Sequence, residues 1–138
     1  MALQEADRLV IFGITGDLAK KMTLPSLYRL ERRGMLNVPV ITVAFDNWTH
    51  EQLINHARES IETVEGKIDE TVFTRLAERL SYVHGDFNDP KVYGKLKKAL
   101  KGSHAATFYL EVPPSLFVIV AQHLYNADLL HGDARVVF

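Results

Sequence analysis

The sequence predicts an α/β domain, a doubly wound and mainly parallel sheet with helices on both faces. Short apolar runs of strand length alternate with longer stretches of helical spacing along the 138 residues, and this alternation is typical of parallel strands joined by helices. Right-handed crossovers then place helices on both faces of the sheet. The 47% hydrophobic content is enough for the core of one domain.

The first predicted strand, residues 8–12, is an apolar run that ends at Gly13. Apolar residues then recur at helical spacing over residues 17–33, so the first unit is a strand, a glycine turn and a helix. Pro25 lies inside this helix, where it removes one hydrogen bond, and we expect the axis to bend near Lys21.

The later elements continue the alternation up to a fifth strand. Strands are predicted at residues 40–45, 81–84 and 105–110, and helices at residues 49–64, 68–80, 89–100 and 113–130. Thr49 and Gln52 have the form of a capping box, and Pro90 occupies the first position of its helix. The fifth strand begins at residue 134 and the sequence stops within it, which predicts a fragment truncated after that strand or a missing partner element.

Charge and composition exclude several classes of protein. The 16 basic and 17 acidic side chains nearly cancel and no stretch gathers one sign, so we expect neither a nucleic-acid partner nor a membrane partner. The absence of cysteine excludes disulfides and cysteine-ligated zinc. No signal-peptide core begins the chain and no apolar run reaches the ~18 residues of a membrane span, so a cytoplasmic location is expected by default.

The histidines show neither metal-ligand spacing nor a partnered carboxylate. We interpret all of them as surface or packing residues, and we expect no metal site. They are His50, His56, His84, His104, His123 and His131.

The segment Gly13–Gly16 predicts a turn that binds a diphosphate. The following helix start presents unpaired N–H groups and about half a positive charge, two glycines let the backbone approach a ligand, and Thr15 adds a hydroxyl donor. Asp17 is interpreted as a cap or first-turn anion that points away from the ligand. Because Ile11 stands where the first glycine of G-x-G-x-x-G would be, glycines that serve only a tight turn are the alternative. A Walker loop fits less well, since no G-K-[ST] follows.

Five segments of the chain together resemble the amino-terminal, nucleotide-binding part of the glucose-6-phosphate dehydrogenase family. They are GITGDLAKK, LPSLYRL, SYVHGDFND, FYLEVPPSLF and ARVVF, and the resemblance runs from about residue 9 to residue 138. It implies a Rossmann-like dinucleotide-binding domain over residues 1–138 of a longer protein, whose substrate and catalytic domain follows this chain. The implied reaction oxidises glucose 6-phosphate to 6-phosphogluconolactone, with hydride transfer to a nicotinamide nucleotide, usually NADP, in the pentose phosphate pathway.

The same resemblance implies three coenzyme-binding segments. The diphosphate turn and first helical turns comprise Gly13, Ile14, Thr15, Gly16, Asp17, Leu18, Ala19, Lys20 and Lys21. The adenosine side comprises Tyr82, Asp86 and Phe87, and the nicotinamide side comprises Val112, Pro113 and Pro114. The last segment follows the fourth strand, which agrees with the rule that ligands lie outside the carboxyl ends of strands. The alternatives are that Lys20 and Lys21 are solvated helix lysines and that Tyr82 only packs the strand.

Three positions depart from the family pattern. The arginine that holds the 2′-phosphate of NADP is replaced by Phe45, followed by Asp46. The Asp46 carboxylate would repel that phosphate and accept a hydrogen bond from the ribose hydroxyl of NAD. The family resemblance therefore implies NADP as the coenzyme, whereas Asp46 favours NAD. The alternative is that Asp46 only caps the turn before Thr49. Met22 replaces a lysine that reaches toward substrate, and Glu111 occupies a place that is usually small and apolar.

The catalytic machinery is expected outside this chain. Hydride abstraction from a sugar hydroxyl requires a general base, and the resemblance places it, a histidine oriented by an aspartate, beyond residue 138. We therefore expect no catalytic residue here and no turnover by the chain alone. The expected partners are a nicotinamide dinucleotide and, for the full-length enzyme, glucose 6-phosphate and further copies in a homo-oligomer. The alternative function is a nucleotide-binding or regulatory module without chemistry.

Overall fold

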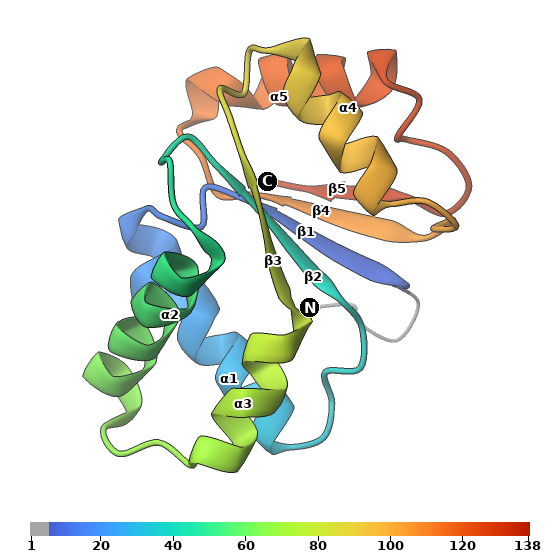
Figure 1. The fold of residues 1–138 in the computed structure, drawn as a ribbon. Coiled ribbons are helices and arrows are strands. Elements are labelled where there is room, and N and C mark those ends of the chain that lie inside the picture. Colours follow the sequence, from blue (N-terminus) through green and yellow to red (C-terminus); the bar gives the residue numbers. More distant parts are fainter. Residues whose placement is uncertain (1–5) are drawn as a thin grey trace.

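The computed structural model describes residues 6–138 and contains one sheet of five parallel strands in the order β3-β2-β1-β4-β5 (Figure 1). The strands are β1 (Arg8–Phe12), β2 (Val40–Ala44), β3 (Leu80–His84), β4 (Ala106–Leu110) and β5 (Arg135–Val137). The central strand β1 pairs with β2 on one side and with β4 on the other. The predicted parallel sheet is confirmed, and residues 1–5 of the predicted domain lie outside the described residues.

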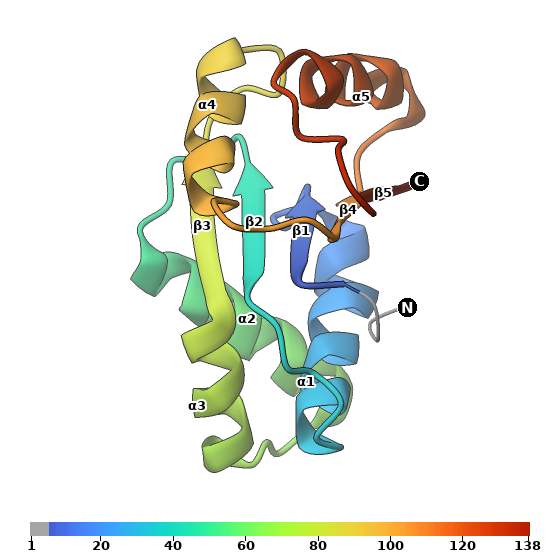
Figure 2. The same ribbon diagram turned by 90° about the vertical axis from the view of Figure 1, so that its right-hand side faces the viewer.

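Helices cover both faces of this sheet, as expected for a doubly wound fold (Figures 1 and 2). One face carries α1 (Leu24–Arg32), α2 (His50–Glu65) and α3 (Glu70–Arg79), and the other carries α4 (Pro90–Ala99) and α5 (Phe117–Asn126). A π-helical turn η1 (Ala19–Thr23) precedes α1, and a 3₁₀ turn η2 (Pro114–Leu116) precedes α5. None of the helices within residues 6–138 is long and apolar enough to cross a membrane.

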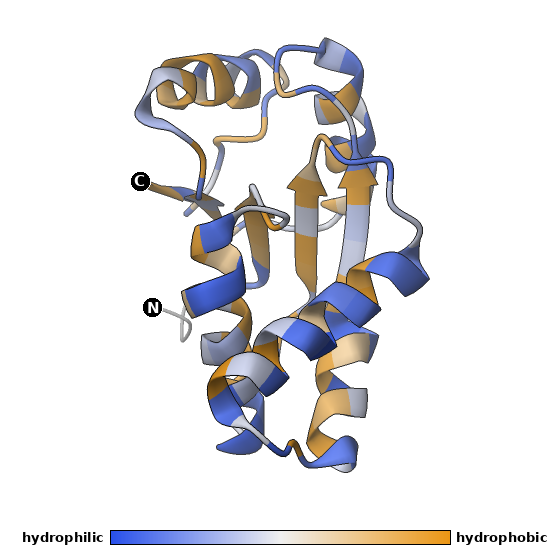
Figure 3. Cartoon of the chain, turned by 90° about the vertical axis from the view of Figure 1, so that its left-hand side faces the viewer, coloured by the Kyte–Doolittle hydropathy of each residue, from blue (hydrophilic) through white to orange (hydrophobic). Residues whose placement is uncertain are grey.

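The inner strands β1, β2 and β4 are buried on both sides because each side faces a layer of helices. Along β1, Leu9 and Ile11 pack with α1, α2 and α3, whereas Val10 and Phe12 pack with α4 and α5. All four side chains are at most 1% exposed, and burying each contributes about 1.5–3 kcal/mol. Figure 3 shows apolar residues along the inner strands and hydrophilic residues on the outward side of α2.

The helix predicted over residues 17–33 is divided near the expected position. Within η1 the N–H of Leu24 donates to the carbonyl of Ala19, one residue further back than in an α-helix. Pro25 stands at the start of α1 and has no N–H to donate toward Lys21. The expected irregularity is therefore a π turn, which places Lys20 and Lys21 on the surface and buries Ala19 and Thr23.

The last helix is shorter than predicted because a tight cap ends it at Asn126. Asp128 adopts a left-handed conformation with φ of 58°, and the N–H of Leu129 donates to the carbonyl of Leu124 at 2.9 Å. These are the marks of a Schellman motif, in which glycine is the usual left-handed residue. The apolar pattern continued to residue 130 because Leu129 packs back on the core after the helix has ended.

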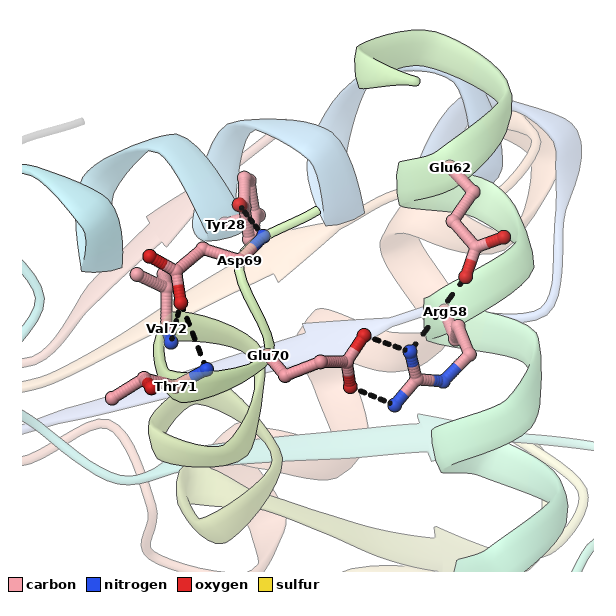
Figure 4. A network of polar contacts seen from close by, with 7 residues as sticks. All are labelled: Tyr28, Arg58, Glu62, Asp69, Glu70, Thr71 and Val72. Atoms are coloured by element: carbon pink, nitrogen blue, oxygen red, sulfur yellow. Dashed lines mark hydrogen bonds and ion pairs between the residues drawn. The ribbon is translucent and has the colours of Figure 1, made fainter. Parts of the chain in front are cut away.

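A polar network fixes the three helices of the first face to one another (Figure 4). The Arg58 guanidinium of α2 forms two hydrogen bonds of 2.8 Å with the Glu70 carboxylate of α3. Asp69 caps α3 by accepting from the N–H of Thr71 at 2.9 Å, and its own N–H donates to the Tyr28 hydroxyl of α1 at 2.9 Å.

Candidate functional site

The carboxyl ends of β1, β2, β3 and β4 lie at one edge of the sheet, because the strands are parallel and paired in register. The strand order reverses between β1 and β4, the two strands that begin the two halves of the fold. In doubly wound proteins ligands bind at such a reversal point, outside the strand ends. The predicted site segments all follow these four strands, and the turn after β1 lies at the reversal.

Gly13 is required by the fold itself. Its φ is 93°, and a Cβ placed on it would lie 2.1 Å from the carbonyl oxygen of Glu111. Its N–H donates to the carbonyl of Val43 at 2.8 Å, while the N–H of Glu111 donates to the carbonyl of Phe12 at 2.9 Å. The turn is therefore held between the ends of β2 and β4. The need for a tight turn is enough to explain a glycine at position 13.

Gly16 has no such requirement. The residue is exposed, and a Cβ on it would meet only the carbonyl oxygen of Gly13, at an ordinary 3.4 Å. Its N–H closes the turn by donating to that same carbonyl at 3.0 Å. No neighbouring side chain fills the space beside it, so the missing side chain leaves the outer surface of the turn open to a ligand.

Two backbone donors of this turn are unpaired within the described chain. The N–H groups of Ile14 and Thr15 make no hydrogen bond to residues 6–138, although the side chain of Ile14 is fully buried and anchors the turn in the core. Lys20 and Lys21 are exposed on the following π turn and have no ion-pair partner among the described residues. Unpaired amides at a helix start with lysines nearby are an anion-binding arrangement.

Asp17 and Leu18 are the first helical residues after the turn, and both are exposed. Of the two roles that the sequence allows for Asp17, a cap or a first-turn anion, the structure therefore shows the second. No capping hydrogen bond from its side chain occurs within the described residues. Its position at the positive end of the helix stabilises the carboxylate through the helix dipole.

Asp46, after β2, faces the glycine turn. The hydroxyl of Thr15 donates to its carboxylate at 3.3 Å, and its carbonyl accepts from the N–H of Trp48 and from the hydroxyl of Tyr82. The cap of α2 is Thr49, through a reciprocal capping box with Gln52, and the roles of Asp46 in the turn before Thr49 and beside a ribose both stay predictions. Phe45, at the position of the family's arginine, is 68% exposed.

An aromatic wall stands beside Asp46, at the ends of β2 and β3. The rings of Trp48 and Tyr82 lie 6.3 Å apart at 25°, and those of Trp48 and His56 lie 4.8 Å apart. Burial, and then the charge of Asp46, raises the pKa of Tyr82 to about 12. Tyr82 does more than pack the strand, because its hydroxyl donates to the carbonyl of Asp46.

His56 was missed as a site residue by the sequence. The His56 imidazole lies beside the backbone of Ile14, and its Nε2 is buried without a hydrogen-bond partner among the described residues. Burial, followed by the charge of Lys20, lowers the pKa of His56, so the neutral imidazole packs against the glycine turn. The available signal was its position on the buried face of α2, three residues after Leu53 and four before Ser60.

Asp86 and Phe87 follow β3 and are engaged within the fold. The Asp86 carboxylate accepts from the N–H of Asn88 at 2.9 Å, and Phe87 packs edge-on against Phe12 with ring centres 5.5 Å apart. The carbonyl of Phe87 accepts from the Tyr93 hydroxyl at 2.7 Å, and burial raises the pKa of Tyr93. Contact of Asp86 and Phe87 with a coenzyme stays a prediction.

The end of β4 lies directly against the glycine turn. A Cβ on Gly13 would come within 3.3 Å of a Val112 methyl group, so the two segments share one surface. Pro113 and Pro114 follow and are exposed. The Glu111 carboxyl accepts from the Thr23 hydroxyl of η1, which joins the end of β4 to the π turn.

Glu111 also carries an unusual buried oxygen. Its Oε1 is buried and has no hydrogen-bond partner among residues 6–138. Burial raises the pKa of this carboxyl, and the bond from Thr23 acts in the opposite direction. A raised pKa favours the protonated form of Glu111, which places no negative charge next to the glycine turn.

The structure thus brings the three predicted segments to one edge, with the diphosphate turn between the other two. Among the described residues, no group of three or more His, Cys, Asp and Glu side chains could hold a metal ion. One histidine does have a carboxylate partner, contrary to the sequence interpretation. His104 Nδ1 lies 3.5 Å from Asp7 Oδ2, at the opposite edge of the sheet, where non-local pairing across 97 residues left no local pattern.

Known proteins resemble this chain closely in sequence and structure. A family model described as "Glucose-6-phosphate dehydrogenase, NAD binding domain" matches residues 10–138. Glucose-6-phosphate 1-dehydrogenase 1 of Mycobacterium tuberculosis (strain ATCC 25618 / H37Rv) is 50% identical over 131 residues, which cover 95% of this chain and 28% of that protein. Glucose-6-phosphate 1-dehydrogenase of Dickeya dadantii is 35% identical over 137 residues, covering 96% and 28%.

Two solved structures have the same fold. The crystal structure of glucose-6-phosphate 1-dehydrogenase from Mycobacterium avium superposes with a TM-score of 0.90 at 51% identity, covering 95% of this chain and 29% of that one. A glucose-6-phosphate dehydrogenase in complex with its substrate glucose 6-phosphate superposes with a TM-score of 0.82 at 30% identity, covering 100% and 31%. The chain spans about 28% of the length of these curated relatives.

Proposed function

The chain belongs to the glucose-6-phosphate dehydrogenase family, and from this premise we propose that it is the coenzyme-binding part of a glucose-6-phosphate 1-dehydrogenase. The proposed enzyme oxidises glucose 6-phosphate to 6-phosphogluconolactone and passes hydride to a nicotinamide dinucleotide. The observation that carries the proposal is the pair of unpaired amides at Ile14 and Thr15, beside the open position of Gly16. They lie where the strand order reverses, which is where dinucleotides bind in this fold class.

Each part of the edge has a role in holding the coenzyme. The Ile14 and Thr15 amides would donate to the diphosphate, and the exposed Lys20 and Lys21 would add positive charge. Val112, followed by two prolines with restricted φ, offers a stiff apolar surface for the nicotinamide end. When bound, the coenzyme supplies the hydride-accepting carbon. The residues of this chain bind and orient that group, and we expect no turnover of glucose 6-phosphate by the chain alone.

The coenzyme choice is proposed to favour NAD over NADP. The Thr15 hydroxyl holds the Asp46 carboxylate at the ribose side of the turn, and Phe45 replaces the family's arginine. Two like charges 4 Å apart repel by about 1 kcal/mol in water and about 4 kcal/mol near a protein surface. NADP would therefore bind roughly fivefold to a thousandfold less tightly than NAD.

Fluorescence titration of the chain with NADH and NADPH tests both proposals. We expect saturable binding of NADH, weaker binding of NADPH, and a smaller difference between the two in Asp46→Asn. Glu51→Gln is the matched control, because Glu51 is an exposed carboxylate at the start of α2. Failure of both nucleotides to saturate removes the coenzyme-binding proposal, whereas NADPH binding more than tenfold tighter than NADH removes only the assignment of Asp46.

Met22 favours a second candidate function, a nucleotide-binding module without chemistry. It stands where the family has a lysine that reaches toward substrate, and its apolar side chain is 60% exposed on η1. The two functions differ in whether the reading frame continues into an E-K-P segment and a later histidine–aspartate pair, which sequencing of the transcript would decide. A cytoplasmic location and homo-oligomeric assembly of the full-length enzyme belong to the first proposal and are supported by the family resemblance.

A further inference from the structure

A cavity of about 480 Å³ opens at the edge of the sheet opposite the glycine turn. Its lining includes Ala106, the first residue of β4, and Ala134, just before β5. Leu100, which directly follows α4, and Leu129, three residues after the end of α5, line it as well. The cavity lies on the face that α4 and α5 cover, because Leu100, Ala106 and Leu129 belong to the core of that face. Its volume falls within the ~300–1,000 Å³ range of small-molecule sites.

The cavity combines an apolar floor with a cationic rim. Leu100 and Leu129 are 7% and 4% exposed and belong to the buried core of this face. The rim carries Lys97, Lys98 and Lys101, which form no ion pair among residues 6–138.

The distribution of charge at the rim of the cavity favours an anion. Asp128 is the one carboxylate among the described lining residues, and the Asp7 carboxylate lies behind the wall, where it accepts hydrogen bonds from the Ser103 hydroxyl and the His104 N–H. The carboxyl ends of α4 and α5 each add about half a negative charge. These charges together offset the three lysines, so the positive charge is confined to the rim, where three lysines stand with one carboxylate.

A glycine keeps one wall of the cavity open. Gly94 lies in the interior of α4 and lines the cavity. A Cβ on it would meet nothing within 4 Å, and its backbone is not in the left-handed region. Glycine weakens a helix interior relative to alanine, and no neighbour in the described chain requires it here. The open wall is therefore an observation independent of the lysines.

We propose that this cavity binds a small organic anion, with an aryl or acyl body and one anionic head. The body lies on Leu100 and Leu129 along the open wall at Gly94, and the head lies among the rim lysines. Because the cavity and the glycine turn are at opposite edges of the sheet, the anion and a dinucleotide bind at the same time. The proposal does not depend on the identity of the coenzyme.

The test is fluorescence titration of the chain with 8-anilinonaphthalene-1-sulfonate, a flat aryl anion, in excess NADH so that the coenzyme turn is occupied. We expect saturable binding that Gly94→Leu weakens at least tenfold, because leucine fills the open wall. Leucine is a better helix former than glycine, so a thermal melt should show a folded variant. Lys98→Gln with Lys101→Gln should weaken binding about 25-fold, at roughly fivefold for each lost charge.

Two controls separate this site from unspecific adsorption. Lys95→Gln removes a lysine of the same helix that does not line the cavity and should change the affinity less than twofold. N-phenyl-1-naphthylamine, the uncharged analogue, should bind equally to the double lysine variant and the parent chain. Equal binding of the sulfonate to Gly94→Leu and the parent, an equal loss in Lys95→Gln, or displacement of the sulfonate by NADH would each overturn the proposal.

Discussion

Replacing the two turn glycines one at a time separates folding from ligand binding. In Gly13→Ala the new methyl group lies 2.1 Å from the Glu111 carbonyl oxygen, where ordinary contact begins at about 3.4 Å. The left-handed φ of 93° costs about 1–2 kcal/mol for a residue with a Cβ, and forcing the ends of β1 and β4 apart costs about 1–3 kcal/mol more. We expect Gly13→Ala to lose about 2–5 kcal/mol of a total of about 5–15 kcal/mol.

Gly16→Ala should leave the stability nearly unchanged and weaken ligand binding. Its methyl group makes only an ordinary contact of 3.4 Å, so the free energy of unfolding should change by less than about 1 kcal/mol. A methyl group between the amides and a diphosphate would remove a charge-assisted hydrogen bond of about 1.5–3 kcal/mol. NADH binding should therefore weaken roughly 10-fold to 150-fold.

The assay for stability is urea unfolding followed by the fluorescence of Trp48, the one tryptophan, with circular dichroism as a second probe. The assay for binding is NADH titration of each folded variant. A Gly13→Ala variant as stable as the parent chain would refute the close approach of β1 and β4. A Gly16→Ala variant with unchanged NADH affinity would refute the role of the turn as a diphosphate site.

Three further predictions concern the groups around these sites. The raised pKa of Glu111 means that its protonated form stabilises the fold, so stability is lost as pH rises above about 4.5, and Glu111→Gln should reduce this loss in urea unfolding measured from pH 4 to 8. The lowered pKa of His56 has the opposite effect on the pH dependence of stability, because the neutral ring is favoured in the folded state. Stability should fall as pH drops below 6.5, and less so in His56→Gln, in melts at matched ionic strength. Gly94→Ala should raise the free energy of unfolding by about 1 kcal/mol, read from the urea midpoint at constant slope, and no gain would mean that a contact requires the glycine.

The sheet could be predicted because its signal is local. Each buried strand is a short apolar run between helices, so the five strands and the parallel topology follow from patterns a few residues long. The turn after β1 was located in the same way, from Gly13 and Gly16. The different roles of these two glycines were not predictable, because the close approach of Glu111 to Gly13 joins residues far apart in sequence.

The residues that sequence analysis interpreted less well make their contacts across the fold. His56 of α2 lies beside the backbone of Ile14, and the Glu111 carboxyl accepts from the Thr23 hydroxyl, 88 positions away. Neither pairing leaves a periodic pattern, and Glu111 was noticed only as a departure from a family position. An irregularity of the helix near Lys21 was predicted from Pro25, because a missing backbone N–H is a local property, but its form as a π turn was not.

The most direct test of the central claim is a ¹H–¹⁵N NMR titration of the chain with NADH. The account predicts saturable shifts in the amide signals of Ile14, Thr15 and Gly16, because these groups at the end of β1 meet the diphosphate. The signal of Leu129, at the opposite edge of the sheet, should not move. Saturable NADH binding that leaves the three turn amides unmoved would contradict the account.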